Sequence, residues 1–351
     1  MPNTFKANCA ATAIGSFPHL DPDAAFGLIS KTLPEVPCWP QLPKRGIQEE
    51  MCVQYTEGMP FFRLIPEKKW FYLEACEDVV ELEYLYEKFL NDDFNSFAVS
   101  PEYAAGLYVL EKHLPEFKNI KALKGQIVGP ITLAANLKDK EGTAALFNTT
   151  YNDAVIKLLC LKAEWQISFL SRFNLPVIIF ADEPYLSCMG SAFATVSSDT
   201  IVNSFNEIFK SIKSFGAVAG IHCCGNTDWD MVLSTELDIL SFDAFIFMDK
   251  VLAYSTHIRE FLERGGILSW GIAPTTPDGL EGINPDDLID KMEKGVAYLS
   301  QKGLDKQAVL QNSLITPSCG TGTLTVEESE KAMSLTYEVS SVLKDRYGLH
   351  L

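Results

Sequence analysis

The feature that most constrains the fold is a regular alternation of short apolar runs with longer amphipathic stretches. Eight runs have the length and composition of buried strands, at residues 11–16, 95–99, 123–129, 177–182, 217–223, 238–243, 267–272 and 310–316. Between most of them lie helix-length segments, at 142–172, 199–214, 250–264, 284–302 and 325–346. Strands that alternate with helices form parallel sheets. The sequence therefore predicts one α/β domain over residues 1–351, a parallel (β/α)8 barrel of the TIM type.

One long segment interrupts this alternation. Residues 33–94 are rich in proline, aromatic and acidic residues, and we expect them to form an irregular insertion after the first strand. The alternative architecture is an open doubly wound sheet. It is disfavoured because no G-x-G-x-x-G phosphate turn follows the first strand.

Composition restricts the partners and the compartment. The 351 residues carry a formal net charge of -17, without a run of Lys/Arg and interleaved aromatics, so neither nucleic acid nor an anionic membrane is an expected partner. The longest apolar runs, such as "PVIIFA" (176–181), are too short to span a bilayer, and the N-terminus lacks the pattern of a signal peptide. Nine scattered cysteines show no disulfide spacing. We therefore expect a cytoplasmic protein with reduced thiols, a few of which could bind metal.

Residues able to do chemistry gather at the ends of the predicted strands. In a (β/α)8 barrel the functional groups lie at the C-terminal ends of the strands. Those ends carry a set of polar residues drawn from nearly the whole chain: Ser16, Asp182, Glu183, His222, Cys224, Asp243 and Cys319. On the predicted fold they share one rim.

His222 and Cys224 stand in the stretch "GIHCCGNTDWD". Side chains two residues apart in a strand point to the same face, so His222 and Cys224 can converge while Cys223 points into the core. Imidazole and thiolate are both zinc ligands. Taken alone, the pair also fits ordinary buried residues at a strand end.

Two further metal ligands are expected from later strands. Cys319 lies in the turn "TPSCGTG", which could carry its thiol to the rim; the alternative is an ordinary loop thiol. Asp243 closes the apolar run "LDILSFD", where a carboxylate needs a metal or another partner. The alternative for Asp243 is a helix cap or a partner for a basic residue. Three protein ligands and an exchangeable fourth position are typical of catalytic zinc.

The remaining candidates would serve the substrate. Of Asp182 and Glu183 in "FADEPYLS", one could hold an amine or act as a general acid or base; the alternative is a capping pair that faces solvent. Ser16, in "AIGSFPH", could present backbone groups to a substrate, although a Gly-Ser turn is also common in loops.

Four of these stretches carry a family resemblance. "TAIGSFPH", "ADEPYL", "IHCCGNT" and "PSCGTGTLTVEESEKAM" resemble, in order, segments of the zinc-bearing C-terminal barrel of cobalamin-independent methionine synthase and of the methylcobamide–thiol methyltransferases in the uroporphyrinogen decarboxylase superfamily. The matches span nearly the whole chain. Together they are specific, and the His-x-Cys and late Cys-Gly segments are the most specific of them.

The resemblance implies a role for each matched residue. His222, Cys224 and Cys319 would bind Zn2+, Asp182 would hold the amine of an amino-acid thiol such as homocysteine, and the Ser16 turn would contact its carboxylate. Glu50 in "RGIQEEMCVQY" matches an acid near the amine, with Glu49 as the alternative. The family has a Glu where Asp243 falls; because Asp is shorter, Asp243 could bind the metal directly or through water.

Two departures from the family shape the expected activity. The chain has no counterpart of the N-terminal half of methionine synthase, which helps hold folate, so the methyl donor could be a corrinoid protein or methylcobalamin. The Arg-rich signature of the decarboxylases is also absent from "VPCWPQLPKRG". The resulting prediction is a zinc-dependent thiol S-methyltransferase acting on a small homocysteine-like or coenzyme M-like thiol. The alternatives are a metal-free decarboxylase and a non-catalytic corrinoid- or thiol-binding accessory protein.

Overall fold

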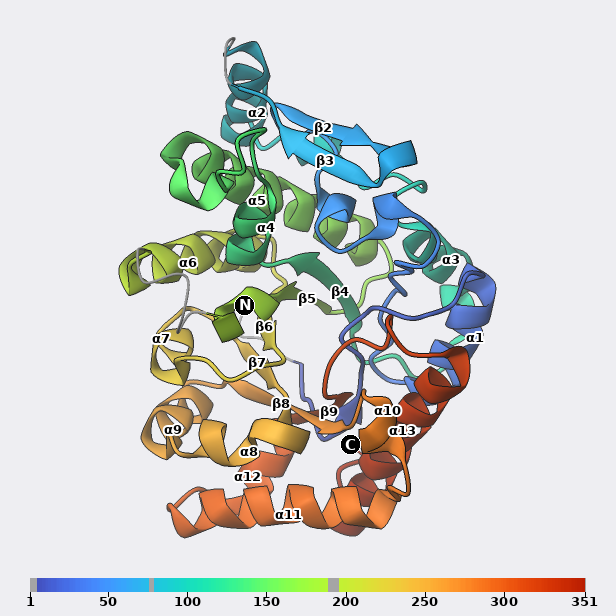
Figure 1. The fold of residues 1–351 in the computed structure, drawn as a ribbon. Helices are drawn as coiled ribbons and strands as arrows, with labels where there is room; N and C mark the ends of the chain where they lie inside the picture. The colour runs from blue at the N-terminus through green and yellow to red at the C-terminus, as the bar shows by residue number, and fades with distance from the viewer. Residues whose placement is uncertain (1–4, 76–78, 189–195, 351) are drawn as a thin grey trace.

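The protein is built around a curled parallel sheet with helices on its outer side (Figure 1). The structure, a computed structural model, describes residues 5–75, 79–188 and 196–350. The sheet has seven strands in the order β1-β9-β8-β7-β6-β5-β4. Their bounds are β1 Ala10–Ala11, β4 Leu123–Val128, β5 Val177–Asp182, β6 Val218–Cys223, β7 Ile239–Phe242, β8 Ile267–Ala273 and β9 Ser313–Pro317.

The helices follow the strands in the predicted alternation. The major ones are α1 Pro22–Thr32, α3 Ala105–His113, α4 Pro130–Asn136, α5 Thr149–Ser171, α6 Ser198–Ser214, α8 Ala244–Leu252, α9 Ser255–Glu263, α11 Pro285–Gln301 and α13 Val326–Tyr347. The short helices α7 Trp229–Leu233, α10 Pro277–Leu280 and α12 Lys306–Gln311 complete the outer layer. None of the described helices is long and apolar enough to cross a membrane.

The strands divide their side chains between two sides of the sheet. In β5, Ile178 and Phe180 belong to an apolar cluster with members on five other strands of the sheet. These members are Ala10 of β1, Val218 of β6, Ile239 of β7, Ile267 of β8 and Leu314 of β9. Ile179 and Ala181 instead pack with the helices in the main core. This alternation is the pleat of a strand buried on both faces. The first cluster fills the inside of the curled sheet, and polar residues further along the strands share that inner face.

The sheet does not form the expected closed barrel of eight regular strands. The run at 95–99 is not a strand, since Phe94–Phe97 form a 3-10 helix. The predicted first strand, 11–16, is reduced to Ala10–Ala11. Between the two edge strands β1 and β4 lies the segment 37–41, which is held by isolated parallel bridges from Cys38 to Lys124 and from Gln41 to Ser16.

Proline explains why this segment is no regular strand. Pro37 and Pro40 have no backbone N–H, so a continuous ladder of hydrogen bonds is excluded. Among the bonds that remain, Lys124 N–H donates to the Pro37 carbonyl (2.9 Å), and Gln41 accepts from Phe17 N–H (2.8 Å) and donates to the Gly15 carbonyl (2.8 Å). Segment 37–41 thus takes the place between β4 and β1 that was predicted for residues 95–99.

The insertion at 33–94 is more regular than expected. Its middle forms an antiparallel hairpin, β2 Phe62–Ile65 and β3 Trp70–Leu73, followed by helix α2 Val80–Leu90. The hairpin and α2 lie together at one side of the molecule, beyond α4 and α5 (Figure 1).

Candidate metal centre

His222 and Cys224 come from the C-terminal end of β6. Val218 stands four residues before His222 on the same strand and belongs to the inner apolar cluster. Because every second side chain of a strand points to the same face, His222 also faces the inside of the sheet. His222 is only 2% exposed. Cys223 is fully buried in the core on the helix side, as the alternation predicts, and Cys224 follows directly after the strand.

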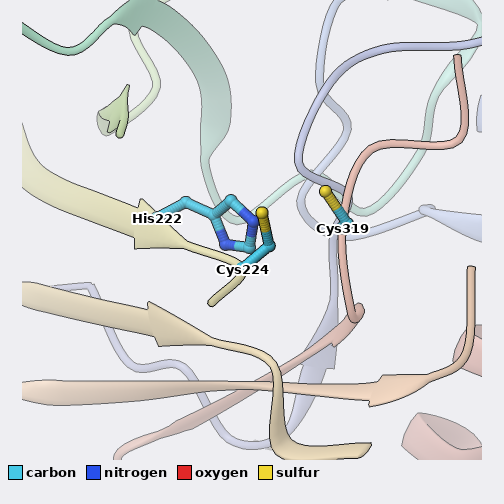
Figure 2. Close-up of side chains that lie close together, drawn as sticks. All are labelled: His222, Cys224 and Cys319. Carbon is cyan, nitrogen blue, oxygen red and sulfur yellow. The ribbon is translucent and has the colours of Figure 1, made fainter. Parts of the chain in front are cut away.

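Cys319 approaches His222 and Cys224 from a distant part of the chain. It lies between β9 and α13, in a turn that ends where Thr325 and Glu328 form a capping box at the start of the helix. One ligand atom each from His222, Cys224 and Cys319 lies within 4.8 Å of the others. Figure 2 shows the imidazole and the two sulfur atoms facing one another.

The orientation of His222 leaves one ring nitrogen for a ligand. Its Nδ1 lies 3.0 Å from the hydroxyl Oγ of Ser241, the residue paired with it on β7. Its Nε2 is buried and has no hydrogen-bond partner among the residues that the structure describes. A buried, unpaired ring nitrogen is unfavourable, and metal binding would satisfy it.

The two thiols interact closely with each other. The nearby Cys319 thiol, and next the His222 imidazole, lowers the pKa of the Cys224 thiol well below its ordinary value. The nearby Cys224 thiol, together with burial, raises the pKa of Cys319. A metal bound here would displace protons from these thiols, since it binds thiolates.

These three residues fit zinc. In tetrahedral sites with Zn–S near 2.3 Å and Zn–N near 2.0 Å, ligand atoms lie roughly 3.5–3.8 Å apart. The 4.8 Å limit of the cluster is within reach of that geometry by side-chain rotation. A His/Cys/Cys set has the ligand number of a catalytic site, in which the fourth position is left for water or substrate.

Asp243, expected as a fourth ligand, lies outside this three-residue cluster. It is the N-cap of α8, and its Oδ1 accepts the backbone N–H of Ile246 at 2.8 Å. Burial raises its pKa to about 6, and the charge of His222 opposes that rise, so the carboxylate lies close enough to interact with the site. Asp243 thus performs the capping role that was its alternative interpretation, and a contact with the metal remains a prediction.

Asp182 ends β5 and is paired in register with His222. Its Oδ1 is buried without a hydrogen-bond partner among the described residues. Burial raises its pKa to about 6, whereas the charges of Lys124 and His222 act to lower it. A buried carboxylate oxygen with a free lone pair beside the cluster is suited to accept a hydrogen bond from a substrate.

Glu183 points elsewhere. It is fully buried, and its carboxyl group accepts hydrogen bonds from the Ile131 N–H (3.0 Å) and the Thr132 hydroxyl in the first turn of α4. Burial raises its pKa to about 8. The alternative interpretation, a capping pair with Asp182 or Glu183 facing solvent, is wrong, because both residues are buried and Glu183 bonds to a helix start inside the protein.

Ser16 supports the turn that carries Cys319. Its backbone carbonyl accepts hydrogen bonds from the N–H (2.9 Å) and the hydroxyl (3.0 Å) of Thr321. Its Oγ accepts the Gly322 N–H at 3.3 Å. These hydrogen bonds join the loop after β1 to the loop after β9, which carries Cys319.

The two candidate acids of the insertion differ in environment. Glu50 is exposed, whereas Glu49 is buried and forms an ion pair with Arg45 at 2.8 Å. Burial raises the pKa of Glu49 to about 7, against the charge of Arg45. Glu50 is thus the acid of the two that is accessible to a ligand, and its contact with a substrate remains a prediction.

Two residues near the centre were missed from the sequence. Ser241 could have been found from the two-residue alternation, since it precedes Asp243 by two positions on the same strand. Lys124 is a fully buried charge in an apolar run; its Nζ donates to the Ile14 carbonyl at 2.5 Å and lies 4.4 Å from the centre of the Phe180 ring.

Comparison with known proteins gives only remote likenesses. No protein-family model matches the chain, and no curated protein sequence matches it. Among solved structures it is similar to a B12-independent methionine synthase from Shewanella sp. W3-18-1, with 11% identity, a TM-score of 0.48, and coverage of 68% of this chain and 67% of that one. It is also similar to a putative vitamin-B12-independent methionine synthase from Listeria monocytogenes, with 16% identity, a TM-score of 0.43 and coverage of 65% and 64%.

A third similar structure is the IolI protein with a bound zinc atom, at 13% identity and a TM-score of 0.39, covering 74% of this chain and 93% of that one. The chain thus spans about two thirds of the length of the two methionine synthases. At these identities and TM-scores, the likenesses assign neither a family nor an activity to the chain.

Proposed function

We propose that the protein is a zinc-dependent thiol S-methyltransferase. The observation that carries the proposal is the buried Nε2 of His222, which has no hydrogen-bond partner among the described residues, in a residue that forms one cluster with the thiols of Cys224 and Cys319. His222, Cys224 and Cys319 would hold the ion. When bound, zinc would act as a Lewis acid that keeps a substrate thiol deprotonated and nucleophilic near neutral pH.

The chain's own residues would bind and orient the acceptor. Asp182 Oδ1 is available to accept a hydrogen bond from an amino group, which favours a homocysteine-like thiol over a coenzyme M-like one. The Ser16 turn is adjacent to the Cys319 turn and could contact a carboxylate, and Glu50 could complete the site from the insertion. Glu183 would act as a positioning residue, because both its oxygens are engaged with α4.

The methyl donor would approach the open side of the centre, above the strand ends. In the transfer, the acceptor sulfur forms a bond to the methyl carbon while the bond from that carbon to the donor breaks, and the donor keeps the bonding electrons. A methylated corrinoid protein or methylcobalamin is the proposed donor. The reaction needs no nucleic acid or membrane, and we place it in the cytoplasm.

The proposal is tested by metal content and turnover together. We expect about one zinc per chain in the purified protein, and loss of that zinc in Cys319→Ser. The matched control is Cys188→Ser, which changes an exposed cysteine outside the cluster and should retain the metal. Demethylation of methylcobalamin is then followed with homocysteine, coenzyme M and other thiols.

The outcomes separate the rival functions. Zinc with thiol-dependent demethylation supports the methyltransferase. Zinc without turnover on any thiol would favour an accessory binding protein, and an active protein without metal would favour a decarboxylase.

A further inference from the structure

The inner face of the sheet carries a layer of hydroxyl groups behind His222. On each of four strands, a Ser or Thr stands two residues after a member of the inner apolar cluster: Ser241 after Ile239, Ser269 after Ile267, Thr316 after Leu314 and Thr12 after Ala10. Side chains two residues apart in a strand share a face. All four hydroxyls therefore point to the inside, directly above the apolar floor.

These residues are neighbours from strand to strand. Ser241 and Ser269 are paired in register between β7 and β8. Thr316 follows Leu314, the partner of Ser269 on β9, by two residues. Thr12 directly follows Ala11, and Thr316 directly follows Ile315, the partner of Ala11. Thr12 therefore lies beside Thr316. The hydroxyls thus form a staggered row that starts at Ser241, the partner of His222, and shifts by two residues between Ser269 and Thr316.

Three hydroxyls of this row have no hydrogen-bond partner among the described residues. The oxygens of Thr12, Ser269 and Thr316 are fully buried and lack a hydrogen bond to any described residue. Buried hydroxyls in native proteins are almost always satisfied, and where protein groups are missing the partner is an ordered water. Three such groups in one layer therefore call for ordered water.

We propose that a cluster of buried waters fills this layer and links Ser241 to Ser269, Thr316 and Thr12. Ser269 and Thr316 are offset by two residues on adjacent strands, so their short side chains are too far apart for a direct hydrogen bond. A water with hydrogen bonds of about 2.8 Å on each side can bridge such a gap.

The cluster would act on the metal centre through Ser241. When Nε2 of His222 binds a metal, Nδ1 carries the proton and donates it to Ser241 Oγ. The Ser241 hydroxyl then needs an acceptor of its own, which the first water supplies. Without that water the serine is free to rotate away from His222. This effect on the metal rests on the proposed function, whereas the presence of water does not.

Three measurements test the proposal. A crystal structure of the purified protein should show ordered water within hydrogen-bond distance of Ser269, Thr316 and Thr12. Thr316→Val, which keeps the side-chain shape, should lower the Tm by about 1–3 °C, and Ser269→Ala should weaken zinc binding about tenfold in a chelator competition. The control is Thr336→Val, a buried threonine in α13 that donates to the Ala332 carbonyl and should leave zinc affinity unchanged.

The opposite results would overturn the proposal. An empty layer together with a raised Tm in Thr316→Val would mean that the hydroxyls are truly unpaired. Ordered water with unchanged zinc affinity in Ser269→Ala would remove the link to the metal. If the wild-type protein binds no zinc, the proposed function fails, but the water density and the sign of the Tm change still decide whether the layer is hydrated.

Discussion

At the scale of single residues, Ser241 holds the imidazole of His222 in place. Its hydroxyl lies 3.0 Å from Nδ1 and so leaves Nε2 as the ring nitrogen that can bind a metal. We expect Ser241→Ala to weaken zinc binding by about 10- to 100-fold, measured by competition with a chromophoric chelator. The control is Ser340→Ala, a buried serine that donates to the Cys9 carbonyl and is not part of the metal cluster. Equal zinc affinity in wild type and Ser241→Ala would show that the serine does not orient the ring.

Glu183 should make stability depend on pH. Its pKa is raised from 4.5 to about 8 in the folded protein, chiefly by burial. The folded state therefore binds this proton more tightly than the unfolded state does, and the contribution to stability is complete below pH 4.5 and is lost as pH rises through about 8. We expect the urea midpoint of the wild type to fall from pH 5 to pH 8 more steeply than that of Glu183→Gln. Parallel profiles for the two proteins would contradict the assignment.

At the scale of elements, the turn between β9 and α13 determines where Cys319 lies. A Cβ on Gly320 would come within 2.1 Å of Ser16 Oγ, so Gly320→Ala must displace either the turn or Ser16. We expect a loss of about 1–3 kcal/mol in unfolding free energy, with weaker zinc binding, measured by urea titration and chelator competition.

The double variant Ser16→Gly/Gly320→Ala tests this explanation, because it removes the clashing hydroxyl and should restore part of the zinc affinity. The control Gly27→Ala lies within α1, where no atom approaches the added Cβ within 4 Å, and it should stabilise the protein by up to about 1 kcal/mol. A Gly320→Ala protein with normal zinc affinity would show that the turn tolerates the shift.

The elements also show how far the sequence determines the structure. The strands from β4 to β9 lie within a few residues of their predicted positions, and β5 matches 177–182, because each is a buried apolar run between helices. The error at 95–99 has a tertiary cause: the place beside β4 is taken by the proline-containing segment 37–41, whose strand-like pairing no periodicity reveals. The site shows the same division. The convergence of His222 with Cys224 could be predicted from strand alternation. The hydrogen bonds of Glu183 to α4 could not be predicted, because they depend on packing between distant segments.

At the scale of the whole molecule, one apolar core connects the insertion to the C-terminal helix. The main cluster includes Leu73 of β3, Leu82 of α2 and Leu343 of α13. The single domain predicted from the sequence should therefore unfold as one unit. We expect coincident urea transitions by far-UV circular dichroism and by tryptophan fluorescence, for which Trp39, Trp229 and Trp270 are buried probes. Two separated transitions would show that the insertion, or another part, folds independently.

The position of Cys319 has a further consequence for how long the folded protein survives. The sulfur atoms of Cys224 and Cys319 meet although β7, β8 and β9 lie between them in the chain. An ion held by both would close that stretch into a loop and restrict the unfolded chain much as a disulfide does. Metal loss would then shorten the protein's lifetime against proteases, so that chelation in the cell would act as a signal for degradation as well as a loss of reactivity.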